Sequence, residues 1–531
     1  MNKPFLQLAC AISLIGTSFS SLADSSVSIP TTNQQYASYV ILGQAPDGSN
    51  VALARTVIDT GLDCPTLLAE GSKTPISMIT RDNPNHFSVM VCEALVNFDT
   101  SYQIQFSNKS IALPVVKSNP EHIQVFGDTG CKLSKPGKSG GCYFNSPAIP
   151  FKIMADKGAR KNPDLVLHMG DFNYRGTSGK THFTQKDTDG KLSQQVQWPY
   201  DAGDGLSQAE QCGQAPGTPF YSQSAQNSNR PDIWRNWHDD VFKPAGKLML
   251  TAPWLVARGN HELCSRAGPG YFYFMDPHSN LIAGDQQMSC PTPDINKGAM
   301  ANSLQIPSYK VSFNNLDVVV VDSANACDSY TNSPFEAVYK KVMLDVNTLA
   351  KNDAQPTWLV THRPIWGIDS YEANTSTGCT SKDQYACINQ MMQTAIKSLP
   401  SQALPASIDL ILTGHMHKFE SVSFPGSNRP PSLIIGSSGV ELSNSAPYGA
   451  TQTTIDNLPA TVLSTSSSIT YKGKTQPAFG YMSIKLDNKG GWKGELHGAE
   501  QDRVLVKCSS EQNLAQGVCE LDKNVGVVTG I

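Results

Sequence analysis

The sequence is poor in charge and, beyond its first 23 residues, has no long hydrophobic run. Charged residues make up 16% of the 531 positions, the formal net charge is −4, and no lysine- or arginine-rich segment is present. We therefore expect no nucleic-acid partner. A membrane helix needs ~18 to 20 apolar residues, so no membrane span is predicted in the mature chain. With 39% hydrophobic residues, the composition is that of a globular protein long enough for more than one domain.

The CxxC spacing is also missing, which argues against a zinc knuckle or a thioredoxin-like site. Of the 13 cysteines, Cys10 lies in the N-terminal segment, and the other twelve are an even number suited to disulfides in an oxidising compartment. Cysteines close in sequence predict four local disulfides: Cys64–Cys92, Cys131–Cys142, Cys379–Cys387 and Cys508–Cys519. The remaining four leave three connectivities open: Cys212, Cys264, Cys290 and Cys327.

Residues 1–23 have the pattern of a secretory signal peptide. Lys3 precedes an apolar region from Phe5 to Ile15, and Ser21-Leu22-Ala23 is a small-x-small cleavage site. An uncleaved anchor is the alternative, but the polar segment up to Ser21 would make a weak bilayer span. The sequence therefore predicts an exported protein, periplasmic or secreted.

Residues 24–119 alternate short β-rich runs, such as Tyr39–Leu42 and Phe87–Val91, with turns such as Pro46-Asp47-Gly48. This pattern predicts a small all-β sandwich domain. The region has no cluster of His, Asp and Glu, so we expect it to serve as a scaffold or a docking domain.

From about residue 120 to 500, short apolar runs alternate with helical segments, which predicts a layered α/β domain of sheets flanked by helices. Helical spacing is found in Phe335–Leu349 and Gln384–Leu399. The predicted buried strands are Ile123–Phe126, Leu165–Met169, Trp254–Ala257, Val318–Val321, Trp358–Thr361 and Ile408–Leu412. Residues 176–235 and 263–303 are expected to form loops over the site rather than core. Residues 501–531 form a C-terminal extension that contains Cys508 and Cys519.

Residues that commonly bind metals follow these strands. A Gly-Asp, Gly-Asn or Thr-His pair marks the end of four of the six runs, and Gly414-His415-Met416-His417 follows the last run. Each pair alone is also an ordinary turn, but the carboxyl ends of strands in an open α/β sheet meet at one crevice. We expect Gly414 to permit a bend that lets the two imidazoles converge on metal. The candidate ligands are Asp128, Asp171, Asn260, His362, His415 and His417.

The ordered set GDTG, GDFNY, GNHE, VTH and GHMH resembles the purple acid phosphatases, a branch of the calcineurin-like metallophosphoesterases. The resemblance covers about residues 121–440, with the Phe479-Gly480-Tyr481 strand in addition, and implies an exported bacterial member. The wider group usually opens with Asp-x-His, where this chain has Gly130. Tyr174, three residues after Asp171, corresponds to the tyrosine that marks the purple branch.

The resemblance also implies a dinuclear metal centre. Asp128, Tyr174 and His417 would hold one ion, and Asn260, His362 and His415 would hold the other, with Asp171 bridging the two. Carboxylate and phenolate oxygens suit Fe(III), whereas two imidazoles with an amide oxygen suit a divalent ion such as Fe, Zn or Mn. Such a pair would hydrolyse a small phosphate ester with a metal-activated water as the nucleophile.

The proton donor is less well defined. His261 resembles the family histidine that contacts the phosphate or protonates the leaving group, although a turn histidine behind the site is the alternative. Some relatives carry another histidine roughly ten residues past the fourth motif, where this chain has Glu372. A glutamic acid whose pKa is raised by burial can act as a general acid, but an ordinary solvated loop glutamate is the favoured alternative at that position. Four aromatics of the long segments either wall the pocket or pack those loops: Trp198, Tyr200, Tyr271 and Tyr273.

The sequence thus predicts an exported acid phosphatase acting on phosphomonoesters. A phosphodiesterase or nucleotide pyrophosphatase would use the same metal pair, and the choice between them stays open. An exported binding or adhesive protein that retains the fold is a further alternative, against which the complete ligand set argues. The sequence does not fix the oligomeric state.

Overall fold

The computed structural model of the chain describes residues 34–528, apart from 83, 85–86, 131–149, 175–231, 265, 292–302, 329–334, 352–354, 370–385, 444–446, 488–489, 501–502 and 512–516. The predicted signal peptide and Glu372 lie outside the described residues.

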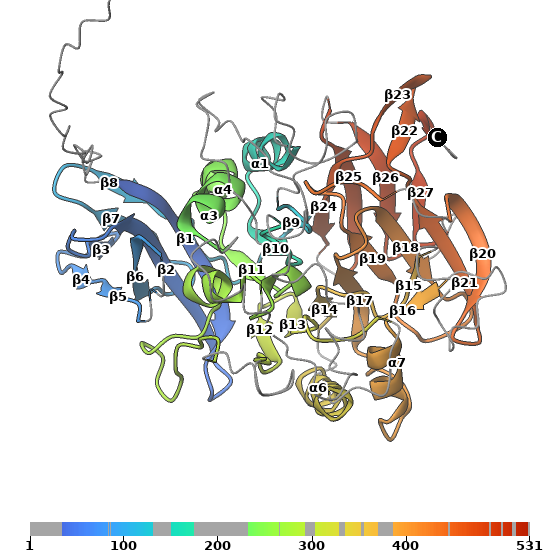
Figure 1. The fold of residues 1–531 in the computed structure, drawn as a ribbon, viewed down its shortest axis with the longest axis horizontal. Coiled ribbons are helices and arrows are strands. Elements are labelled where there is room, and N and C mark those ends of the chain that lie inside the picture. Colours follow the sequence, from blue (N-terminus) through green and yellow to red (C-terminus); the bar gives the residue numbers. More distant parts are fainter. Residues whose placement is uncertain are drawn as a thin grey trace, which may run out of the picture.

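Two large sheets pack face to face and are covered by helices on both outer sides (Figure 1). The first has eleven strands, in the spatial order β27 (Cys519–Leu521), β26 (Val504–Ser509), β25 (Trp492–Gly498), β24 (Gly480–Leu486), β9 (His122–Phe126), β10 (Leu165–His168), β11 (Trp254–Val256), β1 (Gln35–Gln44), β2 (Asn50–Asp59), β6 (Val89–Leu95) and β5 (Ile79–Thr80). The second has eight strands, β12 (Tyr309–Ser312), β13 (Asp317–Val321), β14 (Thr357–Thr361), β17 (Ile408–Thr413), β19 (Ser432–Ile435), β18 (Phe419–Ser423), β21 (Leu458–Ser464) and β20 (Gly449–Ile455).

The centre of each sheet is parallel. Strands β9, β10, β11 and β1 run parallel in the first sheet, and β13, β14, β17 and β19 do so in the second. Parallel strands covered on both faces are built from continuous apolar runs, and β13 shows how these runs are used. Val318 and Val320 face the core shared with the first sheet, while Val319 and Val321 join the core under the outer helices. All six predicted strands are present, and the layered α/β class is confirmed.

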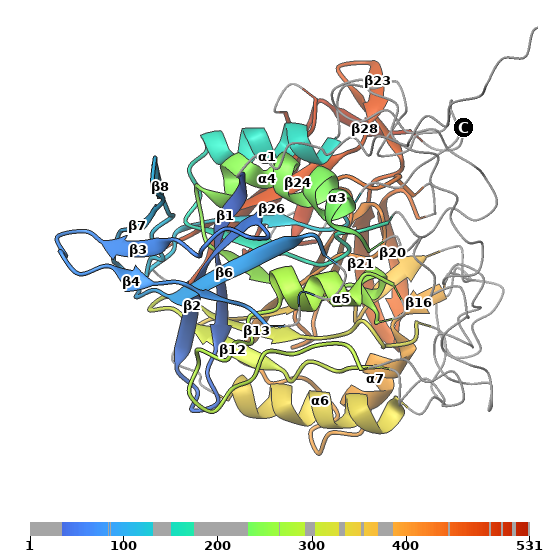
Figure 2. The same ribbon diagram turned by 60° about the vertical axis from the view of Figure 1, so that its left-hand side comes forward.

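The helices form the two outer layers (Figure 2). On one side lie α1 (Pro150–Arg160), α3 (Trp234–Trp237), η2 (His238–Phe242) and α4 (Lys243–Met249), of which α1 and α4 contact each other. On the other side α6 (Glu336–Leu349) contacts α7 (Gln390–Lys397). The predicted helix 335–349 is therefore present, whereas the predicted helix 384–399 is shorter. Strand β16 (Ala386–Ile388) comes first, and Asn389 caps α7 by accepting a hydrogen bond from the Met392 N–H at 2.9 Å.

Three small sheets accompany the two large ones. They contain β4 (Ile76–Ser77), β3 (Thr66–Ala69), β7 (Tyr102–Gln105) and β8 (Ser110–Ala112); β15 (Gly367–Asp369) and β16; and β23 (Lys474–Pro477), β22 (Ser468–Tyr471) and β28 (Val525–Val527).

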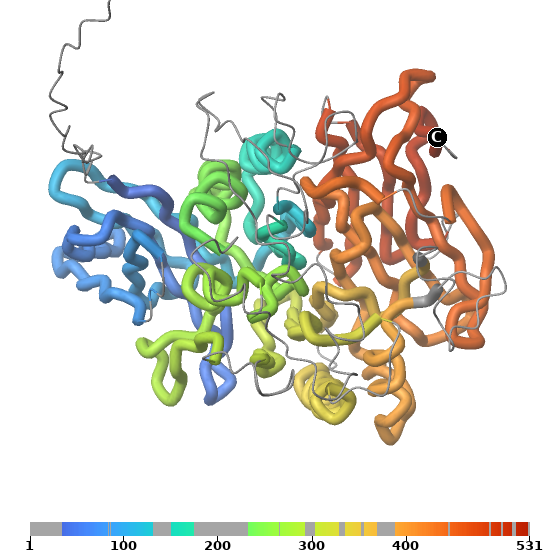
Figure 3. Tube along the Cα trace, viewed as in Figure 1, coloured from blue at the N-terminus to red at the C-terminus, as the bar shows by residue number. Residues whose placement is uncertain are grey.

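The strands of the N-terminal region and several strands near the C-terminus extend the first sheet in opposite directions (Figure 3). The N-terminal region is strand-rich as predicted, but β1 pairs in parallel with β11, with Ile41 opposite Trp254. Residues 37–43 of β1 are all buried, as a central strand requires. At the other edge, β26 and β27 come from the predicted C-terminal extension. Strands on either side of residue 119, and on either side of residue 500, therefore share one sheet.

The prediction that residues 263–303 form a loop over the site is wrong for residues 268–275. Instead of a loop over the site, residues 268–275 form η4 (Tyr271–Met275) and the short α5 (Gly268–Gly270), and every one of them is buried. Tyr271 and Tyr273 belong to the main core. Four consecutive aromatic rings make the segment too apolar to remain on the surface. Trp198 and Tyr200 lie outside the described residues.

Three disulfides are described. Cys64–Cys92 and Cys508–Cys519 form as predicted, and Cys264–Cys290 is one of the pairings that the sequence left open. Cys327 is also disulfide-bonded. Cys131, Cys142, Cys212 and Cys379 lie outside the described residues. No helix in the described part of the chain is long and apolar enough to cross a membrane.

Candidate metal centre

The predicted ligands lie where strands of both sheets end. The first sheet supplies the residues that follow β9, β10 and β11, and the second supplies those that follow β14 and β17. The strand ends of the two sheets therefore face each other across one site. The structure brings together all seven predicted metal ligands: Asp128, Asp171, Tyr174, Asn260, His362, His415 and His417.

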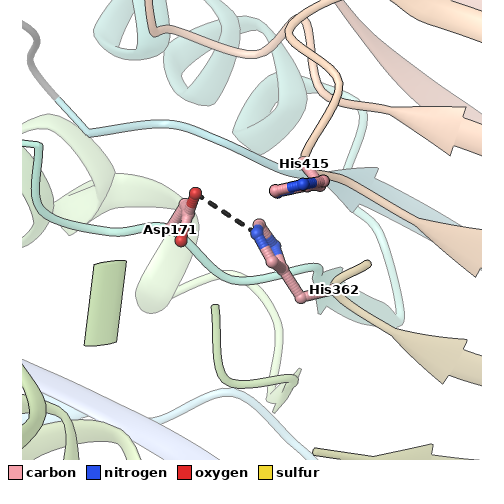
Figure 4. Close-up of side chains that lie close together, drawn as sticks. All are labelled: Asp171, His362 and His415. Atoms are coloured by element: carbon pink, nitrogen blue, oxygen red, sulfur yellow. Dashed lines mark ion pairs between the residues drawn. The ribbon is translucent and has the colours of Figure 1, made fainter. Parts of the chain in front are cut away.

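One half of the site combines an amide with two imidazoles and a carboxylate. Figure 4 shows the imidazoles of His362 and His415 and the Asp171 carboxylate. The Asn260 Oδ1 atom lies 2.9 Å from His362 Nε2 and 2.9 Å from His415 Nδ1. His362 Nε2 is also 3.2 Å from Asp171 Oδ2. The other nitrogen of His362, Nδ1, donates to the Met169 carbonyl at 2.7 Å, which directs Nε2 into the site.

The other half is rich in oxygen. The Tyr174 hydroxyl lies 2.6 Å from Asp128 Oδ1, 2.7 Å from Asp171 Oδ2 and 3.0 Å from His417 Nε2. Asp171 is thus shared by two groups of converging side chains, one with His362 and His415 and the other with Asp128 and His417. A shared carboxylate between two groups is the arrangement that a bridging ligand requires.

The electrostatics of the site fit bound cations. Burial raises the pKa of Asp128 to about 8. The charge of His362 opposes this rise, and the Asp171 carboxylate adds to it. Burial, Asp128 and Asp171 together hold the pKa of the Tyr174 phenol well above its usual value of 10. Acidic oxygens crowded in this way resist ionisation until a cation compensates their charge. The donor set therefore suits a metal pair.

Backbone bends place the ligands, but not where the sequence suggested. Asp128, Asp171 and His415 have φ values of 57°, 59° and 73°, in the left-handed region that residues with side chains rarely adopt. Gly414 was expected to make the bend, yet the bend lies at His415. Gly414 is needed for space instead, because a Cβ there would lie 2.5 Å from Asp128 Oδ2.

Glu262 supports the Asp171 loop, a role that the sequence analysis missed although the GNHE motif contains it. Its buried carboxylate accepts hydrogen bonds from the N–H groups of Asp171 and Phe172, both at 2.8 Å, and from Gly259 at 3.1 Å. Burial and the Asp171 charge raise the pKa of Glu262 to about 8. A side chain on Gly259 would overlap Asp171 Oδ1. Glu262 of the GNHE motif therefore positions Asp171 of the GDFNY motif.

His168 is fully buried behind the site. Its Nδ1 accepts from the Gly170 N–H at 3.1 Å, so Nε2 carries the proton and donates to Thr129 Oγ1 at 2.9 Å. Its ring stacks on Phe172, with centroids 3.9 Å apart. Burial lowers its pKa to about 3, which keeps the imidazole neutral.

Gly130 explains the departure from the Asp-x-His pattern. A Cβ at this position would lie 2.7 Å from Tyr174 Cδ2 and 2.7 Å from the Phe172 carbonyl oxygen. The Tyr174 ring therefore occupies the space that a histidine at position 130 would need.

His261 lies at the edge of the site. Its backbone N–H donates to Asp171 Oδ1 at 2.8 Å, and its half-buried ring lies with its centroid 4.0 Å from that of Tyr174. This position is compatible with contact to a substrate.

A model of the calcineurin-like phosphoesterases matches residues 122–419 of the chain. The chain belongs to this family. The phosphoesterase family expected from the motifs is thereby confirmed. No curated protein matches the chain.

Two solved structures are distantly similar to the chain. Purple acid phosphatase PPD1 from seeds of yellow lupin (Lupinus luteus) is 13% identical, with a TM-score of 0.46 over 89% of this chain and 73% of its own. GAP50, described as the anchor in the inner membrane complex of Plasmodium, is 10% identical, with a TM-score of 0.37 over 76% of this chain and 90% of its own. Neither similarity assigns an activity to this phosphoesterase.

Proposed function

We propose that this phosphoesterase is an exported acid phosphatase of the purple type, which hydrolyses phosphomonoesters with an Fe(III) ion and a divalent ion. The Fe(III) ion would be held by Asp128, Tyr174 and His417. The divalent ion would be held by Asn260, His362 and His415, with Asp171 bridging.

The proposal rests on the position of the Tyr174 oxygen, which lies within 2.7 Å of two carboxylates and 3.0 Å from an imidazole nitrogen. A phenol that only packed in the core would not require two carboxylates, both of which raise its pKa. Phenolate and carboxylate are hard donors that favour a trivalent ion. The lack of room for a side chain at Gly130 supports the same branch.

The residues have distinct roles in the proposed reaction. Metal ions bound here would polarise the phosphate ester and supply the water nucleophile at low pH. Met169 orients the His362 ring through its carbonyl, and Glu262 fixes the loop that presents the Asp171 carboxylate. His261 would contact a phosphate oxygen or give a proton to the leaving group. The described disulfides suit an oxidising compartment and support export.

The ligand assignment is tested by Tyr174→Phe in iron-replete protein. The wild type should show a visible charge-transfer band from phenolate to Fe(III), and the variant should lose this band together with its preference for Fe(III) over divalent ions. Tyr39→Phe is a matched control, because Tyr39 is also fully buried and its hydroxyl donates to the Phe274 carbonyl, at 2.8 Å, rather than to a residue of the site. A wild type without the band, or a Tyr174→Phe variant that keeps it, would refute the purple assignment.

The substrate class is tested with metal-quantified protein, by comparing a nitrophenyl monoester with a bis-nitrophenyl diester between pH 4 and 8. We expect preferential monoester hydrolysis with an acidic optimum. Preferential diester hydrolysis would replace the proposal by the phosphodiesterase alternative. Two bound metals without hydrolysis of either ester would indicate a binding protein that retains the fold.

A further inference from the structure

His415 has a polar partner on the side of its ring that faces away from Asn260. The Nε2 atom lies 2.8 Å from Oδ2 of Asp328, a carboxylate located after strand β13 and only 4% exposed. Neither the motifs nor the strand-end pattern point to Asp328, which is 87 residues away from His415 in sequence. The ring is therefore held between an amide oxygen on one nitrogen and a carboxylate on the other.

Asp328 is itself held from two other directions. The Arg363 NH1 group donates to Oδ2, and the Asn389 Nδ2 group donates to Oδ1 at 3.0 Å. Arg363 directly follows His362, while Asn389 is fully buried and also caps helix α7. The carboxylate is thus fixed by groups from the loop after β14 and from the start of α7.

This arrangement determines which nitrogen of His415 can bind a metal. Nδ1 faces Asn260 in the site, so its lone pair must be free and the ring proton must be on Nε2. Among the groups near Nε2, Asp328 can accept that proton in a hydrogen bond, whereas the Arg363 guanidinium, 3.1 Å away, can only donate. The carboxylate also restrains a ring whose backbone has a φ value of 73°.

We propose that Asp328 is a positioning residue of the metal centre: by accepting a hydrogen bond from His415 Nε2, it fixes the tautomer and the orientation in which Nδ1 binds the ion shared with Asn260 and His362. This inference rests on the proposed dinuclear site. Because Asn389 bonds to the same carboxylate, Asp328 links the start of α7 to His415. Within the described part of the chain, the Asp328 carboxylate bonds to His415, Arg363 and Asn389, none of which belongs to the proposed Fe(III) ligands.

The experiment titrates metal-free full-length mature protein with Zn²⁺ and measures the two binding steps by equilibrium dialysis and calorimetry. Losing such a partner typically costs ~10- to 100-fold in metal affinity, so Asp328→Ala should weaken one Zn²⁺ step by about that factor and leave the other unchanged. Asp328→Asn, nearly identical in shape, should weaken the same step, because its amide must turn a donor toward Asn389 or Arg363. It also serves as the test if the alanine variant does not fold.

Asp317→Asn is the matched structural control. Asp317 begins the same strand β13, is 1% exposed and pairs with Lys310 at 3.2 Å, so its loss should lower thermal stability without changing either Zn²⁺ step. Unchanged Zn²⁺ binding in both Asp328 variants would overturn the inference. An equal loss of both ions, or a loss reproduced by Asp317→Asn, would do the same. A wild type that binds fewer than two ions would instead refute the proposed function.

Discussion

Two buried clusters of charged side chains in this protein differ in how completely their charges are compensated. The metal cluster consists of the seven predicted ligands and Glu262. The arginine cluster consists of Arg55, Arg81 and Glu93, and it connects strands β2 and β6 to the segment around η4. All three members of the arginine cluster are at most 2% exposed.

The arginine cluster is complete without any added ion. Glu93 Oε2 accepts from Arg55 Nε at 3.0 Å and from Arg81 NH1 at 2.6 Å. Further guanidinium hydrogens bind backbone carbonyls, from Arg55 to Phe274 and from Arg81 to Phe272, both at 3.0 Å. Every charge therefore has a partner, and the cluster joins the N-terminal strands to the core segment 271–278.

The metal cluster is compensated only in part: His362 and His261 outweigh burial and hold the pKa of Asp171 well below its usual value, but the other buried carboxylates are not balanced in this way. The pKa values of Asp128 and Glu262 rise to about 8, because burial and the Asp171 charge oppose their ionisation. In the arginine cluster, by contrast, burial alone would raise the pKa of Glu93, but Arg55 and Arg81 outweigh it and hold the pKa below its ordinary value of 4.5. The comparison indicates that two guanidinium partners keep Glu93 ionised, whereas Asp128 resists ionisation until a cation compensates its charge.

The largest effect is expected for Asp171→Ala, which removes the carboxylate shared by both halves of the metal cluster. Both metal content and turnover should fall, with turnover reduced by about 10³-fold or more, since metal clamping contributes several kcal/mol to phosphate-ester hydrolysis. Metal analysis and a monoester assay on the same preparation measure the two effects.

The matched control is Asp276→Ala, which removes a fully buried carboxylate beside the arginine cluster and should leave the metal content unchanged. An Asp171→Ala protein with two bound metals and near-native turnover would contradict the role assigned to Asp171.

Arg81→Ala should lower the stability of the fold and leave metal binding unchanged, the reverse of the effect expected for Asp171→Ala. It leaves Glu93 short of one partner and leaves three carbonyls of the segment 272–278 without their donor, and breaking a buried pair in this way costs about 3–5 kcal/mol of unfolding free energy. Urea denaturation measures this loss, with the 45%-exposed Arg235 replaced by Ala as the control.

At urea concentrations below its unfolding midpoint, the Arg81→Ala protein should bind both metals as the wild type does. A loss of stability under about 1 kcal/mol, well short of the cost of breaking a buried pair, or a selective loss of one ion, would show that the two clusters are not separate in function.

The residues that come together in the metal cluster could be selected from the sequence because the pattern that marks them is local. Each candidate follows an apolar run by a few residues, and parallel strands must bring such positions to one edge. Tyr174 could be assigned only from the resemblance to a family, since a tyrosine after a Gly-Asp turn is otherwise unremarkable. Glu262 could have been identified from the sequence, because it belongs to the GNHE motif and a glutamate beside a buried turn commonly binds backbone N–H groups.

The arginine cluster and Asp328 were missed because their partners are remote. Arg55 binds Phe274, 219 residues away, and no local pattern distinguishes it from a surface arginine. The parallel pairing of Ile41 with Trp254 is equally non-local, so no pattern in the sequence indicated that β1 of the strand-rich N-terminal region joins the first sheet. In residues 268–275 an unbroken aromatic run concealed the helical periodicity.

The smallest effect, and the one that tests the comparison most directly, is the pH dependence of the arginine cluster in Glu93→Gln. Glutamine keeps the size of the side chain and some of the hydrogen bonds but removes the charge, so we expect a loss of about 2 kcal/mol at neutral pH. Because the folded pKa of Glu93 lies below its ordinary value of 4.5, its stabilising contribution is fully present above about pH 4.5 and is lost as the pH falls through the folded pKa. The difference in unfolding free energy between the wild type and Glu93→Gln should therefore stay constant from pH 7 to about pH 5 and shrink below about pH 4.5. Urea denaturation of both metal-free proteins at several pH values measures this difference. Taking the difference cancels the contributions of the titrating groups that both proteins share. A difference that grew toward acid pH would mean that Glu93 is protonated in the folded protein, and the two clusters would then not differ in the way argued.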